Sequence, residues 1–212
     1  MEFPLYDRTP GGNCGFLGFR MCQNRIAVAV LSYLLETGGF AQVIELGTQL
    51  GGLTVLLGLQ CHMQGIRLDS FDLEAASPYQ EWFERFGVHY HIGDIFRPEG
   101  VATIQVLIQA PGRALVLCDN GNKAREFATF APFLKSGDVI GAHDYHPDGD
   151  YDPRRWAWHE IRDTDLQEVC EQHHLEPFLP EAATEAAWVM KIKASCGQGL
   201  TPDSVADREE RR

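Results

Sequence analysis

Acidic and imidazole side chains follow two apolar runs of this sequence, in the stretches ALVLCDNG and DVIGAHDY. The first stretch supplies Asp119 and Asn120, and the second supplies His143 and Asp144. If both runs are neighbouring parallel strands, these side chains converge at the carboxyl edge of the sheet, where open sheets bind ligands. Carboxylates joined by one imidazole suit Mg²⁺ or Mn²⁺, which keep coordination positions free for water and substrate. We therefore predict a divalent-metal site formed by Asp119, Asp144 and His143.

A second interpretation of these carboxylates requires no ion. Asp119 and Asp144 could instead cap helices or form ion pairs with Lys123 and Arg125. Ion pairs of this kind are common on protein surfaces and contribute little free energy when they are exposed. Residue types alone do not separate the two interpretations, so both stay open at this point.

Length and composition favour one globular domain that binds a small molecule. The chain has 212 residues, of which 44% are hydrophobic, and this is enough for one full core. Its formal net charge of -12 argues against nucleic acid as a partner, because phosphate contacts need clustered lysine and arginine. We expect no membrane-spanning segment and no signal peptide, and hence a cytoplasmic protein. The six cysteines form no C-x-x-C pair, which favours reduced thiols, and the sequence is compatible with a homo-oligomer.

Short β-rich apolar runs alternate with longer helix-like segments between residues 41 and 143. This alternation is typical of crossover units in which helices cover both faces of a parallel sheet. Strands are predicted near 42-46, 66-71, 88-92, 114-118 and 138-142, and helices near 22-37, 51-63, 78-86, 98-109, 123-134 and 159-173. LEPFLP and AAWVMKIKA add two probable strands. We predict a single doubly wound, Rossmann-like α/β domain with a mostly parallel sheet of about seven strands and helices on both faces.

Three regions follow from this assignment. Residues 1–21 form an N-terminal segment that we expect to contribute to a substrate pocket or lid, and residues 22–195 form the domain itself. Residues 196–212 are polar and almost free of large apolar side chains. Such a composition predicts a disordered tail.

The first predicted strand ends in a glycine turn, within VIELGTQLGG. Glu45 lies at the end of the strand, Gly47 at the turn, and Gly51 at the start of the next helix. Glycine at such positions lets the backbone pass close to a ligand, because no Cβ stands in the way. The dinucleotide fingerprint G-x-G-x-x-G does not fit, because Thr48 follows Gly47 and the next glycine comes four positions on. The turn, Thr48 included, is therefore a candidate ligand contact without a pyrophosphate cradle.

Acids also follow the second and third predicted strands. Asp72 ends the second strand, about twenty residues beyond the glycines, where a carboxylate can accept both ribose hydroxyls of a nucleoside. Asp94 follows the third strand and could lie beside the base. Three consecutive strand ends with glycine or aspartate at the binding edge predict nucleoside binding.

With these residues in this order, the chain resembles the class I S-adenosylmethionine-dependent methyltransferases over about residues 22–193. The pattern E-x-G-x-x-x-G-G is similar to that of the metal-dependent small-molecule O-methyltransferases. That group includes the catechol type and enzymes often labelled cephalosporin hydroxylase or sugar O-methyltransferase. The resemblance implies that the methionine portion of the cofactor lies near Glu45, Gly47 and Gly51, its ribose near Asp72 and its adenine near Asp94.

The same resemblance implies a reaction. S-adenosylmethionine would methylate a hydroxyl of a small molecule or sugar, with a divalent metal at Asp119 and Asp144. The reaction also needs a base, and from their positions in the sequence Lys123 or His143 could take the proton. The chain departs from the family pattern at His143, where an acid is usual, and at Asn122, where a lysine or histidine is usual. A negatively charged crevice suits a sulfonium cation.

Two other functions use the same features. A nicotinamide-dependent oxidoreductase would share the glycine turn and Asp72, but it needs a pyrophosphate-binding loop and a catalytic pair that the sequence does not offer. A non-catalytic nucleoside-binding protein of the same fold is the other alternative, because fold does not imply function.

Overall fold

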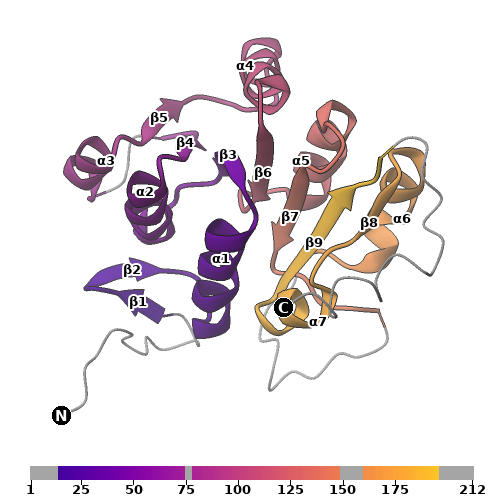
Figure 1. Ribbon diagram of the computed structural model, residues 1–212, viewed down its shortest axis with the longest axis horizontal. Helices are drawn as coiled ribbons and strands as arrows, with labels where there is room; N and C mark the ends of the chain where they lie inside the picture. The colour runs from indigo at the N-terminus through magenta and orange to yellow at the C-terminus, as the bar shows by residue number, and fades with distance from the viewer. Residues whose placement is uncertain (1–13, 75–77, 149–159, 196–212) are drawn as a thin grey trace, which may run out of the picture.

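The computed structural model describes residues 14–74, 78–148 and 160–195. Its centre is a seven-stranded sheet in the order β5-β4-β3-β6-β7-β9-β8 (Figure 1). The strands are β3 (Phe40–Leu46), β4 (Arg67–Asp72), β5 (His89–Ile92), β6 (Arg113–Cys118), β7 (Val139–His143), β8 (Leu175–Pro177) and β9 (Trp188–Lys193). β3 to β7 run parallel, and β9 is antiparallel to both of its neighbours. The predicted fold class is confirmed.

Helices cover both faces of the sheet and enclose two apolar cores. One face carries α1 (Arg25–Thr37), α2 (Gly52–Gln64), α3 (Gln80–Phe86) and α7 (Pro180–Glu185); the other carries α4 (Pro98–Gln109), α5 (Lys123–Phe130) and α6 (Asp163–Gln172), with a short 3-10 turn, η1 (Ala131–Phe133), after α5. In β3, Val43 belongs to the first core and Ile44 to the second, because successive side chains point to opposite faces. A strand covered on both sides is therefore mostly apolar, which is why the sequence showed β3 as a run, although Gln42 and Glu45 are buried polar residues within it. None of the described helices has the length and apolar character that crossing a lipid bilayer requires.

An N-terminal hairpin, which the sequence did not predict, packs on this domain. Within the described residues, β1 (Cys14–Phe16) pairs with β2 (Phe19–Met21) alone, through a turn in which Leu17 and Gly18 both have positive φ. Two such residues in a row are typical of a type I′ turn. β2 lies close to the first turn of α2, where a Cβ on Gly52 would overlap the carbonyl of Arg20. The hairpin thus reaches the amino end of α2.

The sheet changes direction between β3 and β6. From β3 the chain builds β4 and β5 on one side, and it returns through α4 to build β6 and β7 on the other. The amide of Gly47 donates to the carbonyl of Phe71 at 2.9 Å, and that of Asp119 donates to the carbonyl of Leu46 at 2.8 Å. Hydrogen bonds therefore continue past the ends of these three strands. Open α/β sheets bind their ligands at such a switch point.

Candidate functional site

A cavity of about 540 Å³ opens at the switch point between β3 and β6. This volume is in the range of small-molecule binding sites. Its walls bring together eight of the ten residues predicted from the sequence: Gly47, Thr48, Gly51, Asp72, Asp119, Lys123, His143 and Asp144. The β2 strand and the residues after it contribute Arg20, Cys22 and Gln23. Side chains far apart in the chain therefore share one cavity.

The two remaining predicted residues lie elsewhere. Glu45 is completely buried, and its Oε2 accepts hydrogen bonds from Thr54 at 2.7 Å and from Ser70 at 2.5 Å. Burial raises the pKa of this carboxyl to about 7. Asp94 borders a second cavity of about 250 Å³, near the end of β5. Neither carboxyl lines the main cavity, so Glu45 does not contact a cofactor bound there. Its bond to Ser70, which in turn contacts Thr48 of the glycine turn, gives it a structural position behind that turn.

The glycine turn after β3 brings the backbone against β6. Gly47 has a φ of +105°, and a Cβ there would overlap the backbone of Asp119. Only glycine meets both conditions without strain. The amide of Gln49 then donates to Asp72 Oδ2 at 2.7 Å, which ties the turn to the end of β4. The turn and Asp72 thus form one wall of the cavity.

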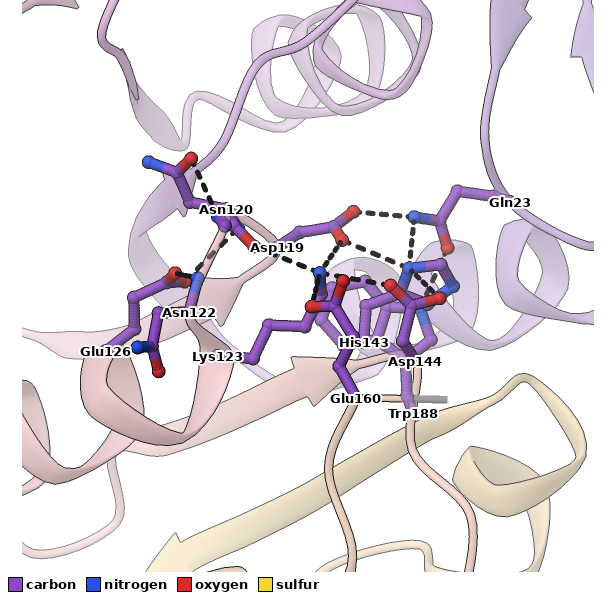
Figure 2. A network of polar contacts seen from close by, with 11 residues as sticks. Gln23, Asp119, Asn120, Asn122, Lys123, Glu126, His143, Asp144, Glu160 and Trp188 are labelled. Carbon is purple, nitrogen blue, oxygen red and sulfur yellow. Dashed lines mark hydrogen bonds and ion pairs between the residues drawn. The ribbon is translucent and has the colours of Figure 1, made fainter. Parts of the chain in front are cut away.

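The predicted metal ligands form a tight cluster in another part of the same cavity lining. Asp119, His143 and Asp144 each offer a ligand atom, and these atoms lie within 4.8 Å of one another (Figure 2). His143 Nδ1 is 3.0 Å from Asp119 Oδ1 and 3.4 Å from Asp144 Oδ1. Burial alone would lower the pKa of His143, but the two carboxylates outweigh it and raise the pKa above its usual value. Asp144 has a φ of +55°, an uncommon conformation that in proteins is often found at functional sites.

Lys123 lies beside this cluster. Its Nζ lies 2.8 Å from Glu160 Oε2, 3.0 Å from Asp144 Oδ2 and 3.8 Å from Asp119 Oδ1 (Figure 2). The predicted ion pairs of Asp119 and Asp144 with Lys123 are therefore present. Burial lowers the pKa of Lys123, but the carboxylates outweigh that effect and raise it well above the usual range. An ammonium held in this way does not suit the predicted role of Lys123 as a base.

Three side chains that take part in the polar network around Asp119 and Asp144 escaped the sequence analysis. Gln23 follows β2, and its amide donates to Asp119 Oδ2 at 2.7 Å. Its oxygen accepts the indole N–H of Trp188, in β9, at 2.9 Å. Glu160 lies in the segment between β7 and α6, and its backbone amide donates to the Asp144 carbonyl at 2.8 Å. No spacing rule marks these residues, because each reaches the site through the tertiary fold.

Comparison with solved structures gives the same fold. A CmcI structure described as a Mg–SAM complex aligns with a TM-score of 0.60 at 16% identity, covering 85% of this chain and 76% of that chain. CalS11, a TDP-rhamnose 3′-O-methyltransferase, aligns with a TM-score of 0.51 at 13% identity, covering 80% of this chain and 79% of that chain. The CMeT domain of the citrinin polyketide synthase aligns with a TM-score of 0.51 at 14% identity, covering 81% of this chain and 53% of that chain.

These likenesses establish the fold, and at such low identity they establish nothing further about this chain. No protein-family model matches the sequence, and no curated protein matches it either. The function must therefore be argued from the cavity itself.

Proposed function

We propose that this protein is an S-adenosylmethionine-dependent methyltransferase that methylates a hydroxyl oxygen of a small molecule or sugar with the help of a divalent metal ion. The observation that carries the proposal is the shared cavity, which is lined both by the nucleoside-type residues Gly47 and Asp72 and by a cluster of metal-type ligands, Asp119, His143 and Asp144. One volume can then hold a methyl donor beside an activated acceptor.

The nucleoside-type residues suit S-adenosylmethionine. The absence of a Cβ at Gly47 leaves room for a ligand, and Asp72 can accept the two ribose hydroxyls. The cavity is lined by four carboxylates, from Asp72, Asp119, Asp144 and Glu160, against three basic side chains, from Arg20, Lys123 and His143. This balance favours a sulfonium cation. A structural neighbour with SAM among its ligands, CmcI, adds support by analogy of fold.

The metal-type cluster fits a divalent ion. Two carboxylates and one imidazole are the oxygen-rich donor set that Mg²⁺ and Mn²⁺ accept. Asp119, His143 and Asp144 would hold the ion at the cavity lining. When bound, such an ion lowers the pKa of a hydroxyl and fixes its direction.

The residues of the chain then assist one displacement. The methyl carbon leaves the sulfonium sulfur, whose bonding electrons stay on sulfur, and forms a bond with the acceptor oxygen, while the hydroxyl proton passes to a base. Of the two predicted bases, Lys123 is held as an ammonium, and His143 can take the proton only in a site where Asp119 and Asp144 hold the ion without its imidazole. The Glu160 carboxylate, 30% exposed on the cavity wall, is a second acceptor for the proton. Holding donor and acceptor in one orientation supplies much of the rate.

The alternatives fit the cavity less well. A nicotinamide enzyme of the doubly wound type has a 3-2-1-4-5-6 sheet and a pyrophosphate at the amino end of the first crossover helix. Here an antiparallel strand, β9, lies between β7 and β8, and the Arg20 carbonyl packs against Gly52 at the start of α2. A pyrophosphate would also face the carboxylates of Asp119 and Asp144. A non-catalytic nucleoside-binding protein would have no use for the metal-type cluster.

Calorimetry separates these functions. The proposal predicts that S-adenosylmethionine and S-adenosylhomocysteine bind, that NAD does not, and that addition of Mg²⁺ is required for methyl transfer to a library of hydroxyl compounds. Binding of NAD in preference to S-adenosylhomocysteine would favour the oxidoreductase. Nucleoside binding without turnover on any hydroxyl would favour the non-catalytic protein.

A further inference from the structure

The Lys123 ammonium lies among the same carboxylates that would hold a divalent ion. Its Nζ is 3.0 Å from Asp144 Oδ2 and 3.8 Å from Asp119 Oδ1. The side chain is only 6% exposed, so solvent and salt screen its charge weakly. A cation bound by Asp119 and Asp144 would therefore meet a fixed positive charge within a few ångströms. Like charges at such a distance disfavour one another.

The geometry lets the ion and the ammonium coexist. Asp144 presents Oδ1 to His143 and Oδ2 to Lys123, so an ion at Oδ1 leaves the contact at Oδ2 in place. Two further acceptors hold the ammonium independently of the ligand carboxylates. These are the backbone carbonyl of Asn120 at 3.0 Å and Glu160 Oε2 at 2.8 Å. Lys123 therefore remains beside the ion and acts on it through charge.

We propose that Lys123 lowers the affinity of the Asp119–His143–Asp144 cluster for divalent ions, and that Glu160 limits this effect by pairing with the Lys123 ammonium. The inference rests on the metal site of the proposed function. Lys123 is thus a positioning residue that lowers the affinity of the cluster for the ion. Glu160 raises that affinity by neutralising part of the Lys123 charge, and it is not itself a ligand of the ion. Opposite effects of the two side chains follow, because one adds positive charge and the other neutralises it.

Titration of the full chain with Mn²⁺, followed by calorimetry or by the electron paramagnetic resonance of free Mn²⁺, tests this directly. Lys123→Met should tighten Mn²⁺ binding by about 10-fold or more, because a repelling charge is removed. Lys123→Arg keeps the charge and should stay within about threefold of the parent protein. Glu160→Gln should weaken binding by about threefold or more when Lys123 is present, and should have no effect in the Lys123→Met background.

The variants also distinguish the possible failures. An unchanged or weaker Mn²⁺ affinity in Lys123→Met, with binding still present in the parent, overturns the inference and leaves the proposed metal site intact. Loss of binding on Glu160→Gln in the Lys123→Met background as well would make Glu160 a direct ligand and overturn its assigned role. If neither the parent nor any variant binds Mn²⁺, the metal site and the inference both fail. S-adenosylhomocysteine binding and the melting temperature, measured on each protein, report separately on the cofactor wall and on folding.

Lys123→Met leaves three carboxylates without their cation and could prevent folding. Glu160→Gln in the parent protein then carries the test alone, because Glu160 is 30% exposed at its side chain and its loss leaves the cluster paired with Lys123. An Mn²⁺ affinity equal to that of the parent would contradict the proposal.

Discussion

Replacement of Gln23 by leucine should destabilise the protein far more than the same replacement of a half-buried glutamine that makes one hydrogen bond to an uncharged group. Gln23 is 2% exposed and joins two parts of the fold, because its oxygen accepts the Trp188 indole N–H and its amide donates to Asp119. Leucine would leave the fully buried Trp188 N–H without its acceptor, at a cost of about 1–3 kcal/mol, and would remove a bond to a charged carboxylate worth about 1.5–3 kcal/mol. Added apolar burial recovers about 1 kcal/mol of this. We expect a net loss of about 3 kcal/mol.

Urea unfolding of the parent and the variant measures this loss, with the free energies compared at a common m-value, the slope of the free energy of unfolding against urea concentration. Gln60→Leu is the matched control, because Gln60 is only half-buried and its amide donates at 2.6 Å to the uncharged Ser32 hydroxyl. Its expected cost is about 1 kcal/mol. If Gln23→Leu proves no more destabilising than Gln60→Leu, the Gln23 bridge between β9 and Asp119 does not carry the energy assigned to it.

Three further outcomes are expected. Asp72→Asn keeps an oxygen for the Gln49 amide but loses the charge on the ribose side, so S-adenosylhomocysteine affinity measured by calorimetry should fall by about 10-fold or more. Gly47→Ala forces a Cβ into the Asp119 backbone at positive φ and should lower the urea midpoint by the equivalent of about 2 kcal/mol or more, whereas Gly65→Ala, at positive φ but in open space, should cost less. Burial raises the pKa of Glu45 to about 7, so its carboxyl keeps its proton to a higher pH in the folded than in the unfolded chain, and the free energy of unfolding should fall by up to roughly 3 kcal/mol as the pH rises from about 4.5 to 7. Because burial raises the pKa of Glu126 to about 7 as well, Glu45→Gln should reduce the total fall without abolishing it, in urea titrations at pH 5 and pH 8.

The middle of the sheet could be predicted because β3, β6 and β7 are largely apolar on both sides. β3, β6 and β7 are buried almost throughout, so each appears in the sequence as a largely apolar run, which is followed by a glycine turn after β3 and by aspartate after β6 and β7. The residues after those runs were therefore predicted correctly to meet at one edge. Gly47 and Asp119 show this most clearly, since their backbones are in contact.

Short elements and long-range contacts could not be predicted in the same way. The β1–β2 hairpin has three residues a strand and only one partner, and α7 has six residues between two strands, so neither leaves a periodic pattern. Gln23 reaches the cluster from the segment after β2, and Glu160 reaches it through the backbone hydrogen bond of its amide to Asp144, so only the tertiary fold brings them there. The predicted tail at 196–212 lies outside the described residues, as does most of the N-terminal segment at 1–21.

Crystals grown with S-adenosylhomocysteine and Mn²⁺ test the central claim most directly, since anomalous scattering locates the ion and ordinary density locates the nucleoside. The account predicts the ribose at Asp72 and an Mn²⁺ peak within coordination distance of both Asp119 and Asp144, in the same cavity. A nucleoside bound elsewhere, or a cavity that holds the nucleoside while Asp119 and Asp144 carry no ion peak, would contradict it.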